Sequence, residues 1–279
     1  MRSFALLIIG MAPLFFSSAA VSQTSDLVDR NSLRVCADPA SMPFSNQAGE
    51  GFENRIAELL AQDLGIPLEY TWYPQITGFY RLTLGAKRCD VAMATAAASE
   101  PMLNTNPYYK SVWVLVTRMD GPLRDVVRLD DPRLVGRHLG VVAGTPPATI
   151  FVMRNLMADA KPYPLVVDRR YENPAADMIA DITNGIIDGG VLWGPIAGYY
   201  AKQAGEGLSI QPLVNETAGP PMVYRITLGI RPGELNWKHQ LNEFLDANRS
   251  KIQDILLDYD VPILDEQNRL ITRASAPSP

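Results

Sequence analysis

The stretch Leu33-Arg34-Val35-Cys36-Ala37-Asp38-Pro39 indicates how the chain begins to fold. Its first five residues form a short apolar run typical of a buried strand, and Asp38-Pro39 ends that run in a loop. An amphipathic helix follows, which Gly65 ends, and its apolar face consists of Ile56, Leu59, Leu60 and Leu64. The segments 68–72 and 91–94 are the next two strands. This alternation predicts a parallel sheet with right-handed crossovers.

A second α/β unit begins after Asp120-Gly121-Pro122. Strands are expected at 138–143, 165–167 and 191–193. Helices begin at Thr145-Pro146 and Asn173-Pro174, where an N-cap residue precedes a proline. The Thr145 helix is expected to bury Ile150, Phe151 and Met153.

The last third of the chain contains a strand at 222–230 and two helices, one over 235–248 and one from residue 250. These elements are too few to form a core of their own, so they should pack back on the first unit. The sequence therefore predicts an α/β protein of two lobes with a cleft between them. Lobe 1 comprises 21–117 and 225–270, lobe 2 comprises 122–218, and 271–279 forms a disordered tail. Crossing segments are expected near 116–121 and 218–225.

Residues 1–20 have the pattern of a secretory signal peptide. Arg2 supplies the positive start, an apolar run extends over 4–16, and Ser18-Ala19-Ala20 is a small-residue cleavage site. The apolar run is short for a membrane span, so no membrane insertion is expected after cleavage. A retained N-terminal anchor helix is the alternative.

The charge balance excludes one class of partner. The formal net charge is −5, and the sequence contains no basic block, so we expect no nucleic-acid binding. The two cysteines, Cys36 and Cys89, enter an oxidising compartment after secretion. Their strands should be neighbours in a 2-1-3 sheet order, which predicts a disulfide between them.

Catalytic patterns are absent from the sequence. It contains two histidines, His138 and His239, and has neither a GxSxG motif nor metal-ligand spacing. Phosphate-binding glycine motifs are missing as well. We therefore expect a non-catalytic protein without a metal or cofactor of its own.

Several short segments resemble family 3 of the bacterial periplasmic solute-binding proteins, in order and in spacing. They are Leu33-Arg34-Val35, Gly51-Phe52-Glu53, Cys89-Asp90-Val91, Pro107-Tyr108-Tyr109 and Gly144-Thr145. This resemblance implies the type II two-lobed fold with two crossing hinge segments.

A narrower resemblance is to the MoxJ/XoxJ-type subgroup, which is encoded beside PQQ-dependent methanol dehydrogenases. It rests on 34–39, 43–46, 49–54, 68–75, 193–200 and 261–267. The resemblance implies a periplasmic accessory protein that aids maturation or activation of the dehydrogenase. PQQ and metal would belong to that enzyme, and a c-type cytochrome is a further partner that the resemblance allows.

The family comparison also indicates which ligands are disfavoured. Amino-acid-binding members use an arginine for the ligand carboxylate and an aspartate for the ammonium, where this chain has Pro101 and Trp193. The charge-assisted pair is thereby lost. Desolvating an ammonium against Trp193 costs several kcal/mol, of which a cation–π contact recovers roughly 1–2 kcal/mol. Free amino acids are therefore poor ligands.

The residues expected to line the cleft lie in loops and at element ends. They are Asp38, Met42, Phe44, Glu53, Thr95, Tyr108, Thr145 and Trp193. The loop 38–44 follows the carboxyl end of a strand, where open α/β sheets bind ligands, although Met42 and Phe44 could simply pack under it. Trp193 is either a core aromatic or the cleft floor.

Two of these positions have alternative interpretations based on helix ends. Glu53 either faces the cleft or only stabilises the helix through its interaction with the helix dipole. Thr145 is most simply an N-cap, but free N–H groups beside it could hold an anion or a peptide carboxylate.

Two other functions stay open from the sequence. One is a receptor of an ABC importer for a small non-amino-acid solute. The other is an enzyme resembling periplasmic cyclohexadienyl dehydratase, for which no acid/base pair is visible.

Overall fold

The computed structural model describes residues 26–97 and 101–273. The predicted signal peptide, residues 1–20, lies outside them, as does the end of the predicted tail. Residues 271–273 of that tail are described, and they are bonded to the rest of the chain: Ile271 N donates to Ile263 O at 2.9 Å, and Arg273 pairs with Asp258.

The first half of the chain alternates strands and helices as expected. Its elements are β1 (Leu33–Ala37), β2 (Ala40–Ser41), β3 (Ser45–Asn46), α1 (Phe52–Leu64), β4 (Leu68–Trp72), α2 (Phe79–Leu82), β5 (Val91–Ala96), β6 (Leu103–Asn104) and β7 (Tyr109–Arg118). Strands β4, β1 and β5 are adjacent and parallel, which confirms the 2-1-3 order. Gly65 ends α1 with a φ of 67°, as its place after the helix predicts.

The second half forms the other lobe and then returns to the first. Its elements are β8 (Leu139–Val142), α3 (Pro146–Met153), β9 (Lys161–Tyr163), α4 (Pro174–Thr183), β10 (Gly189–Trp193), α5 (Gly194–Ala204), β11 (Leu208–Pro212), β12 (Val223–Ile230), α6 (Leu235–Ala247) and α7 (Arg249–Asp258). Short 3-10 turns cover Pro132–Leu134 and Met157–Asp159.

Two local predictions in this half are wrong. The expected strand at 165–167 is a loop with exposed Leu165 and Val166, and the strand is β9, which begins four residues earlier in the chain. Met153 is exposed whereas Ile150 and Phe151 are buried. Positions 151 and 153 differ by two residues, which places their side chains on opposite sides of a helix.

Ten of the described strands form one mixed sheet, whose main order is β4-β1-β5-β12-β7-β10-β8-β9, with β11 beside β7 and β6 beside β12. Strands β2 and β3 pair separately. Strand β7 is shared by both lobes, because Tyr109–Val112 pair with β12 and Trp113–Thr117 pair with β10. The pairing therefore places the first crossing inside β7, ahead of the expected 116–121. The lobe boundaries at 117, 122, 218 and 225 stay a proposal.

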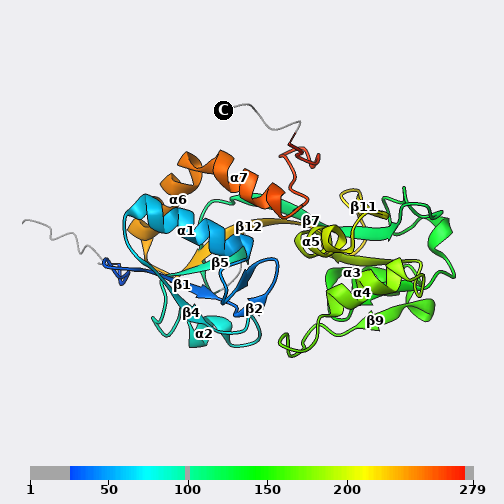
Figure 1. Cartoon of the computed structure of the whole chain (residues 1–279), viewed down its shortest axis with the longest axis horizontal. Helices are drawn as coiled ribbons and strands as arrows, with labels where there is room; N and C mark the ends of the chain where they lie inside the picture. The colour runs from blue at the N-terminus through cyan, green and yellow to red at the C-terminus, as the bar shows by residue number, and fades with distance from the viewer. Residues whose placement is uncertain (1–25, 98–100, 274–279) are drawn as a thin grey trace, which may run out of the picture.

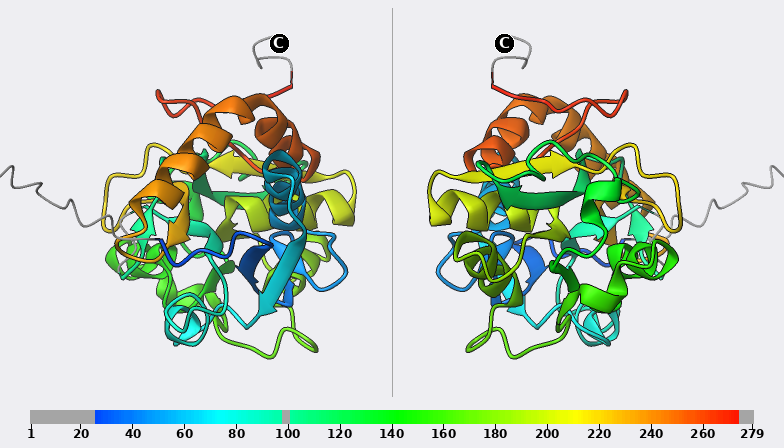
Figure 2. Two further views of the ribbon diagram at one scale, coloured as in Figure 1. Left: turned by 90° about the vertical axis from the view of Figure 1, so that its left-hand side faces the viewer. Right: turned by 90° about the vertical axis from the view of Figure 1, so that its right-hand side faces the viewer.

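Each lobe has its own core. In the first lobe, α1, α6 and α7 lie along one face of the sheet (Figures 1 and 2), and their buried residues include Phe52, Leu241 and Ile252. In the second lobe, one cluster packs around Phe151 and another around Met178. Figure 1 shows the two lobes side by side along the long axis, with β7 and β12 between them.

Candidate functional site

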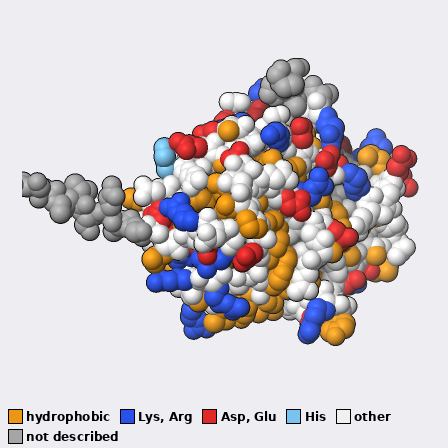
Figure 3. All heavy atoms as spheres, turned by 60° about the vertical axis from the view of Figure 1, so that its left-hand side comes forward, with side chains coloured by type: hydrophobic (Ala, Val, Ile, Leu, Met, Phe, Trp, Pro, Cys, Tyr) orange, Lys and Arg blue, Asp and Glu red, His pale blue; other side chains and the backbone are white. Residues whose placement is uncertain are grey.

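Two adjoining cavities lie between the lobes, with volumes of about 200 Å³ and about 280 Å³. Both are lined by Phe44 and Gln75 from the first lobe and by Trp113 and Trp193 from the strands where the lobes meet. Figure 3 shows one side of the molecule, where hydrophobic side chains gather in a band near the middle. The cavities have mostly apolar walls, which is typical of ligand sites.

The floor of the cavities is aromatic because of strand register. Trp113 of β7 stands directly opposite Trp193 of β10, and their ring centroids are 5.7 Å apart. Tyr224 of β12 packs edge-on against Trp193 at 5.8 Å. The Nε1 of Trp113 is buried and has no hydrogen-bond partner among the described residues. Three rings therefore meet where β7 changes partner from one lobe to the other.

The loop that carries Met42 and Phe44 is fixed on the start of α1. The amides of Phe52 and Glu53 donate to the carbonyls of Pro43 and Phe44, both at 2.9 Å. A Cβ at Gly51 would lie 2.0 Å from the Phe44 carbonyl oxygen, so only glycine allows this approach. Phe44 also packs on Phe52, with ring centroids 5.2 Å apart.

An ion pair joins the two lobes beside the cavity. Nη1 of Arg169 donates to Asp38 Oδ2 at 3.0 Å and to Ser41 Oγ at 2.6 Å. Asp38 is buried, and its carboxylate also accepts from the amides of Ala40 at 2.9 Å and Gln75 at 2.8 Å. Asp38 thus anchors the loop of lobe 1 and the arginine of lobe 2.

The wall from the second lobe is poor in hydrogen-bond donors. Helices α3, α4 and α5 begin at the cavity, and each has a proline at one of its first two positions. Proline has no N–H, so the usual anion-binding donors of a helix start are reduced there.

Thr145 is the N-cap residue of α3, as predicted. Its hydroxyl donates to Val142 O at 2.6 Å and caps no amide. Pro146 and Pro147 have no N–H, and the amide of Ala148 is already bonded to Thr145 O at 3.0 Å. The anion site considered at this helix start therefore lacks its donors.

Glu53 is a buried acid behind the cavity wall, and it lines neither cavity. Its side chain is 2% exposed, and Oε1 has no hydrogen-bond partner among the described residues. Burial, with a smaller contribution from the negative charge of Asp38, raises the pKa of Glu53 to about 8. The acid is therefore protonated at neutral pH.

Two of the expected residues lie away from the cavities. Thr95 is buried in the sheet, where its hydroxyl lies 3.1 Å from the hydroxyl of Thr227. The Tyr108 hydroxyl accepts from the amide of Ala94 at 3.3 Å, and burial raises its pKa well above the usual value. Four of the eight predicted cleft residues line the cavity of about 200 Å³, namely Met42, Phe44, Thr145 and Trp193. Asp38 pairs with Arg169, which also lines it.

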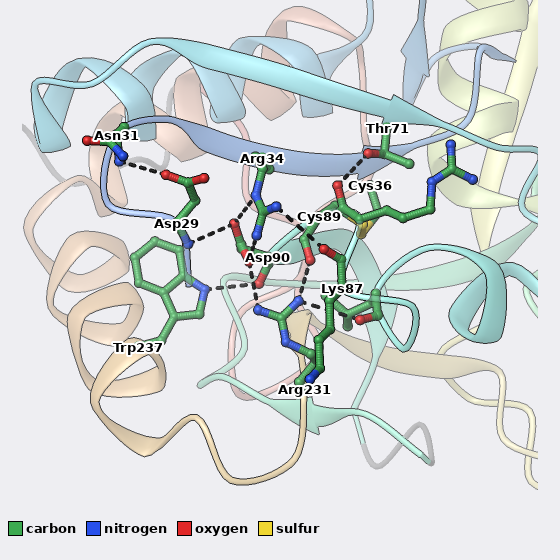
Figure 4. Close-up of polar contacts among 12 residues, drawn as sticks. Asp29, Asn31, Arg34, Cys36, Thr71, Lys87, Cys89, Asp90, Arg231 and Trp237 are labelled. Carbon is green, nitrogen blue, oxygen red and sulfur yellow. Dashed lines mark hydrogen bonds and ion pairs between the residues drawn. A yellow bond between two sulfur atoms is a disulfide. The ribbon is translucent and has the colours of Figure 1, made fainter. Parts of the chain in front are cut away.

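The residues around the disulfide form a structural network and not a site. Cys36 and Cys89 are bonded, as predicted. Next to them, the buried carboxylate of Asp90 accepts from Arg34 Nε at 2.7 Å and from Arg231 Nη2 at 2.7 Å (Figure 4). The Trp237 indole donates to Asp90 O at 3.0 Å. These contacts join β1 and α6 to the residue before β5, and none of the residues lines either cavity.

Sequence reasoning missed several residues of the cavities, above all Arg169, Gln75, Trp113 and Tyr200. Trp113 could have been found from the continuous apolar run 112–116, which is typical of a buried strand. Arg169 lies in a loop, and nothing in its local sequence separates it from Arg170. Within residues 26–97 and 101–273, no helix is long and apolar enough to cross a membrane, and no acid, histidine or cysteine cluster could hold a metal.

Comparison with known proteins identifies the family. No protein-family model matches the chain. Protein MoxJ of Methylorubrum extorquens is 30% identical over 254 residues, which cover 86% of this chain and 84% of that protein.

Solved structures agree with this relationship. The crystal structure of the periplasmic binding protein XoxJ from Methylobacterium extorquens AM1 has a TM-score of 0.72 at 41% identity, over 84% of this chain and all of that one. MxaJ from Methlophaga aminisulfidivorans MPT shares the fold, with a TM-score of 0.71 at 23% identity over 83% of this chain and 100% of that one. The chain therefore belongs to the MoxJ family, whose fold is that of the two-lobed type II periplasmic binding proteins.

Proposed function

We propose that this protein is a non-catalytic periplasmic accessory protein of a PQQ-dependent methanol dehydrogenase. In this proposal the cleft takes a hydrophobic group of the dehydrogenase during its maturation or activation. PQQ and metal belong to the dehydrogenase, and a c-type cytochrome is a further candidate partner. Residues 1–20 would direct the chain to the periplasm.

The observation that carries the proposal is the aromatic floor where the lobes meet. The family resemblance assigns Trp193 to the position of the ammonium-binding acid, and Trp113 and Tyr224 pack against it. Partly buried tryptophan and tyrosine side chains are the residues that most often anchor protein–protein contacts. Membership of the MoxJ family supplies the link to the dehydrogenase.

A second candidate is the receptor of an ABC importer for a small non-amino-acid solute. The cavity of about 200 Å³ and the Arg169–Asp38 bridge across the lobes favour it, because both suit a small enclosed ligand.

Calorimetry with a purified PQQ-dependent methanol dehydrogenase of the same organism distinguishes the two candidates. The accessory function predicts association at about tens of micromolar or below. It also predicts lower PQQ or metal occupancy in dehydrogenase produced without this protein. Absence of association, together with tight binding of a small solute, would support the importer receptor instead.

A further inference from the structure

The Arg169 guanidinium at the cavity has donors that the protein does not use. Both hydrogen bonds that its side chain makes within the described residues come from Nη1, to Asp38 and Ser41. No group within the described ranges 26–97 and 101–273 accepts a hydrogen bond from Nε or Nη2. A guanidinium carries five N–H donors in a fixed plane, so its second edge remains available. The side chain lines the cavity of about 200 Å³ and is 37% exposed.

Asp38 holds Arg169 from a fixed position. Asp38 is 3% exposed and is itself held by two backbone amides. Its negative charge is balanced by Arg169, which reaches it from the loop between β9 and α4 (Figure 1). The neighbouring Arg170 has no such role, because it pairs with Asp168 in the same loop and is 70% exposed.

The other residues of the cavity determine which class of anion could bind to Arg169. The two cavities contain one other charged residue, the exposed Glu172, and their floor is aromatic. The family resemblance assigns Trp193 to the position where amino-acid-binding members have the carboxylate for the ammonium, and prolines remove amide donors at the starts of three helices. The walls therefore suit an apolar body, and the unused donors of Arg169 suit a carboxylate.

We propose that the cavity binds a hydrophobic carboxylate that has no adjacent ammonium group. The apolar body packs on Trp113 and Trp193, and the carboxylate accepts from Nε and Nη2 of Arg169 while Nη1 stays on Asp38. A small aromatic acid and the carboxyl terminus of a polypeptide that ends in a hydrophobic residue share this chemistry. The inference rests on the proposed function at one point: a bound polypeptide end would be the hydrophobic group of the dehydrogenase that the cleft takes.

Calorimetry with matched probes tests the proposal. The probes are 3-phenylpropanoate, the neutral 3-phenylpropan-1-ol, L-phenylalanine, and an acetylated tripeptide ending in phenylalanine with a free or an amidated carboxyl terminus. We expect 3-phenylpropanoate to bind about tenfold or more tightly than the alcohol and than L-phenylalanine. A preference for the free peptide acid over both its amide and 3-phenylpropanoate identifies a polypeptide end as the source, and the reverse order identifies a small acid.

Substitutions at Arg169 locate the carboxylate. Arg169→Gln should abolish the preference for the acid over the alcohol, whereas the control Arg170→Gln should keep it, with near-UV circular dichroism showing that both are folded. If Arg169→Gln does not fold, Arg169→Lys takes its place and should also lose the preference, because an ammonium engaged with Asp38 and Ser41 has no second edge. Equal affinity for acid and alcohol in the wild type overturns the proposal. A folded Arg169 variant that still prefers the acid over the alcohol overturns it as well. Association with the dehydrogenase is measured separately, so it can stand if this inference fails.

Discussion

Glu53 shows how one buried side chain makes the fold sensitive to pH. The acid lies at the start of α1, is 2% exposed, and has an oxygen without a partner among the described residues. Burial first, and then the charge of Asp38, raise its pKa to about 8 from an ordinary value of 4.5. Between these two values the folded protein holds a proton that the unfolded chain has lost. The free energy of unfolding therefore falls as the pH rises through this window.

Glu53→Gln should remove this dependence, because the amide keeps the shape of the protonated acid and does not ionise. Urea unfolding at pH 5 and pH 8 should show that the free energy of unfolding falls by on the order of 3 kcal/mol more in the wild type than in the variant. Glu58→Gln on the exposed side of the same helix is the control and should behave as wild type. Equal pH dependence of wild type and Glu53→Gln would contradict the buried neutral state.

The residues of the site were predictable to different degrees. Met42 and Phe44 followed from the position of their loop after a strand, and Trp193 from the sharp exit that Gly194-Pro195 signals. Arg169 was not predictable, because its partner Asp38 lies 131 residues away and only the packing of the lobes brings them together. Thr95 was expected at the cleft, but its hydroxyl is used within the sheet.

At the scale of elements, hydrophobic periodicity identified the helices well. The face of α1 and its glycine end matched, since an amphipathic helix on a sheet must bury one stripe. Strands in the second lobe were harder. The run 165–167 is apolar but exposed, whereas β9 contains Pro162, which argues against a central strand but is tolerated at the edge of the sheet.

The disulfide joins Cys36 of β1 to Cys89, two residues before β5, and it closes a loop with a sequence separation of 53 residues. Replacing both cysteines with alanine should lower the free energy of unfolding by about 4 kcal/mol, chiefly because the unfolded chain gains freedom. Urea titration of the variant beside the oxidised wild type measures this, and reduced wild type should resemble the variant. Two free thiols in unfolded, unreduced wild type would show that the bond is absent.

The start of α3 bears on ligand choice. Pro146 and Pro147 remove amide donors at the start of the helix, and Trp193, which the family resemblance assigns to the position of the ammonium-binding acid, lines the cavity. The common L-amino acids should therefore show no binding by calorimetry at about 100 µM. A low-micromolar dissociation constant for any of them would mean that the cavity has polar contacts beyond those described.

At the scale of the whole molecule, one strand and one ion pair control how the lobes meet. Strand β7 belongs to both lobes through β12 and β10, so the aromatic floor is built where the lobes share backbone. The Arg169–Asp38 ion pair joins the two lobes beside the cavity. The general two-lobed form was predictable from strand–helix alternation, but the place of the crossing was not, because β7 reads as a single uninterrupted apolar strand.

The measurement that tests the central claim most directly is the affinity of the Trp193→Ala variant for the PQQ-dependent methanol dehydrogenase. If the indole anchors the partner in the cleft, calorimetry should show association weakened by about 1–3 kcal/mol, with a melting temperature close to that of wild type. Val135→Ala, which changes an exposed apolar side chain away from the cavity, should bind as wild type does. A Trp193→Ala protein that is equally stable and binds the dehydrogenase unchanged would contradict the role of the cleft.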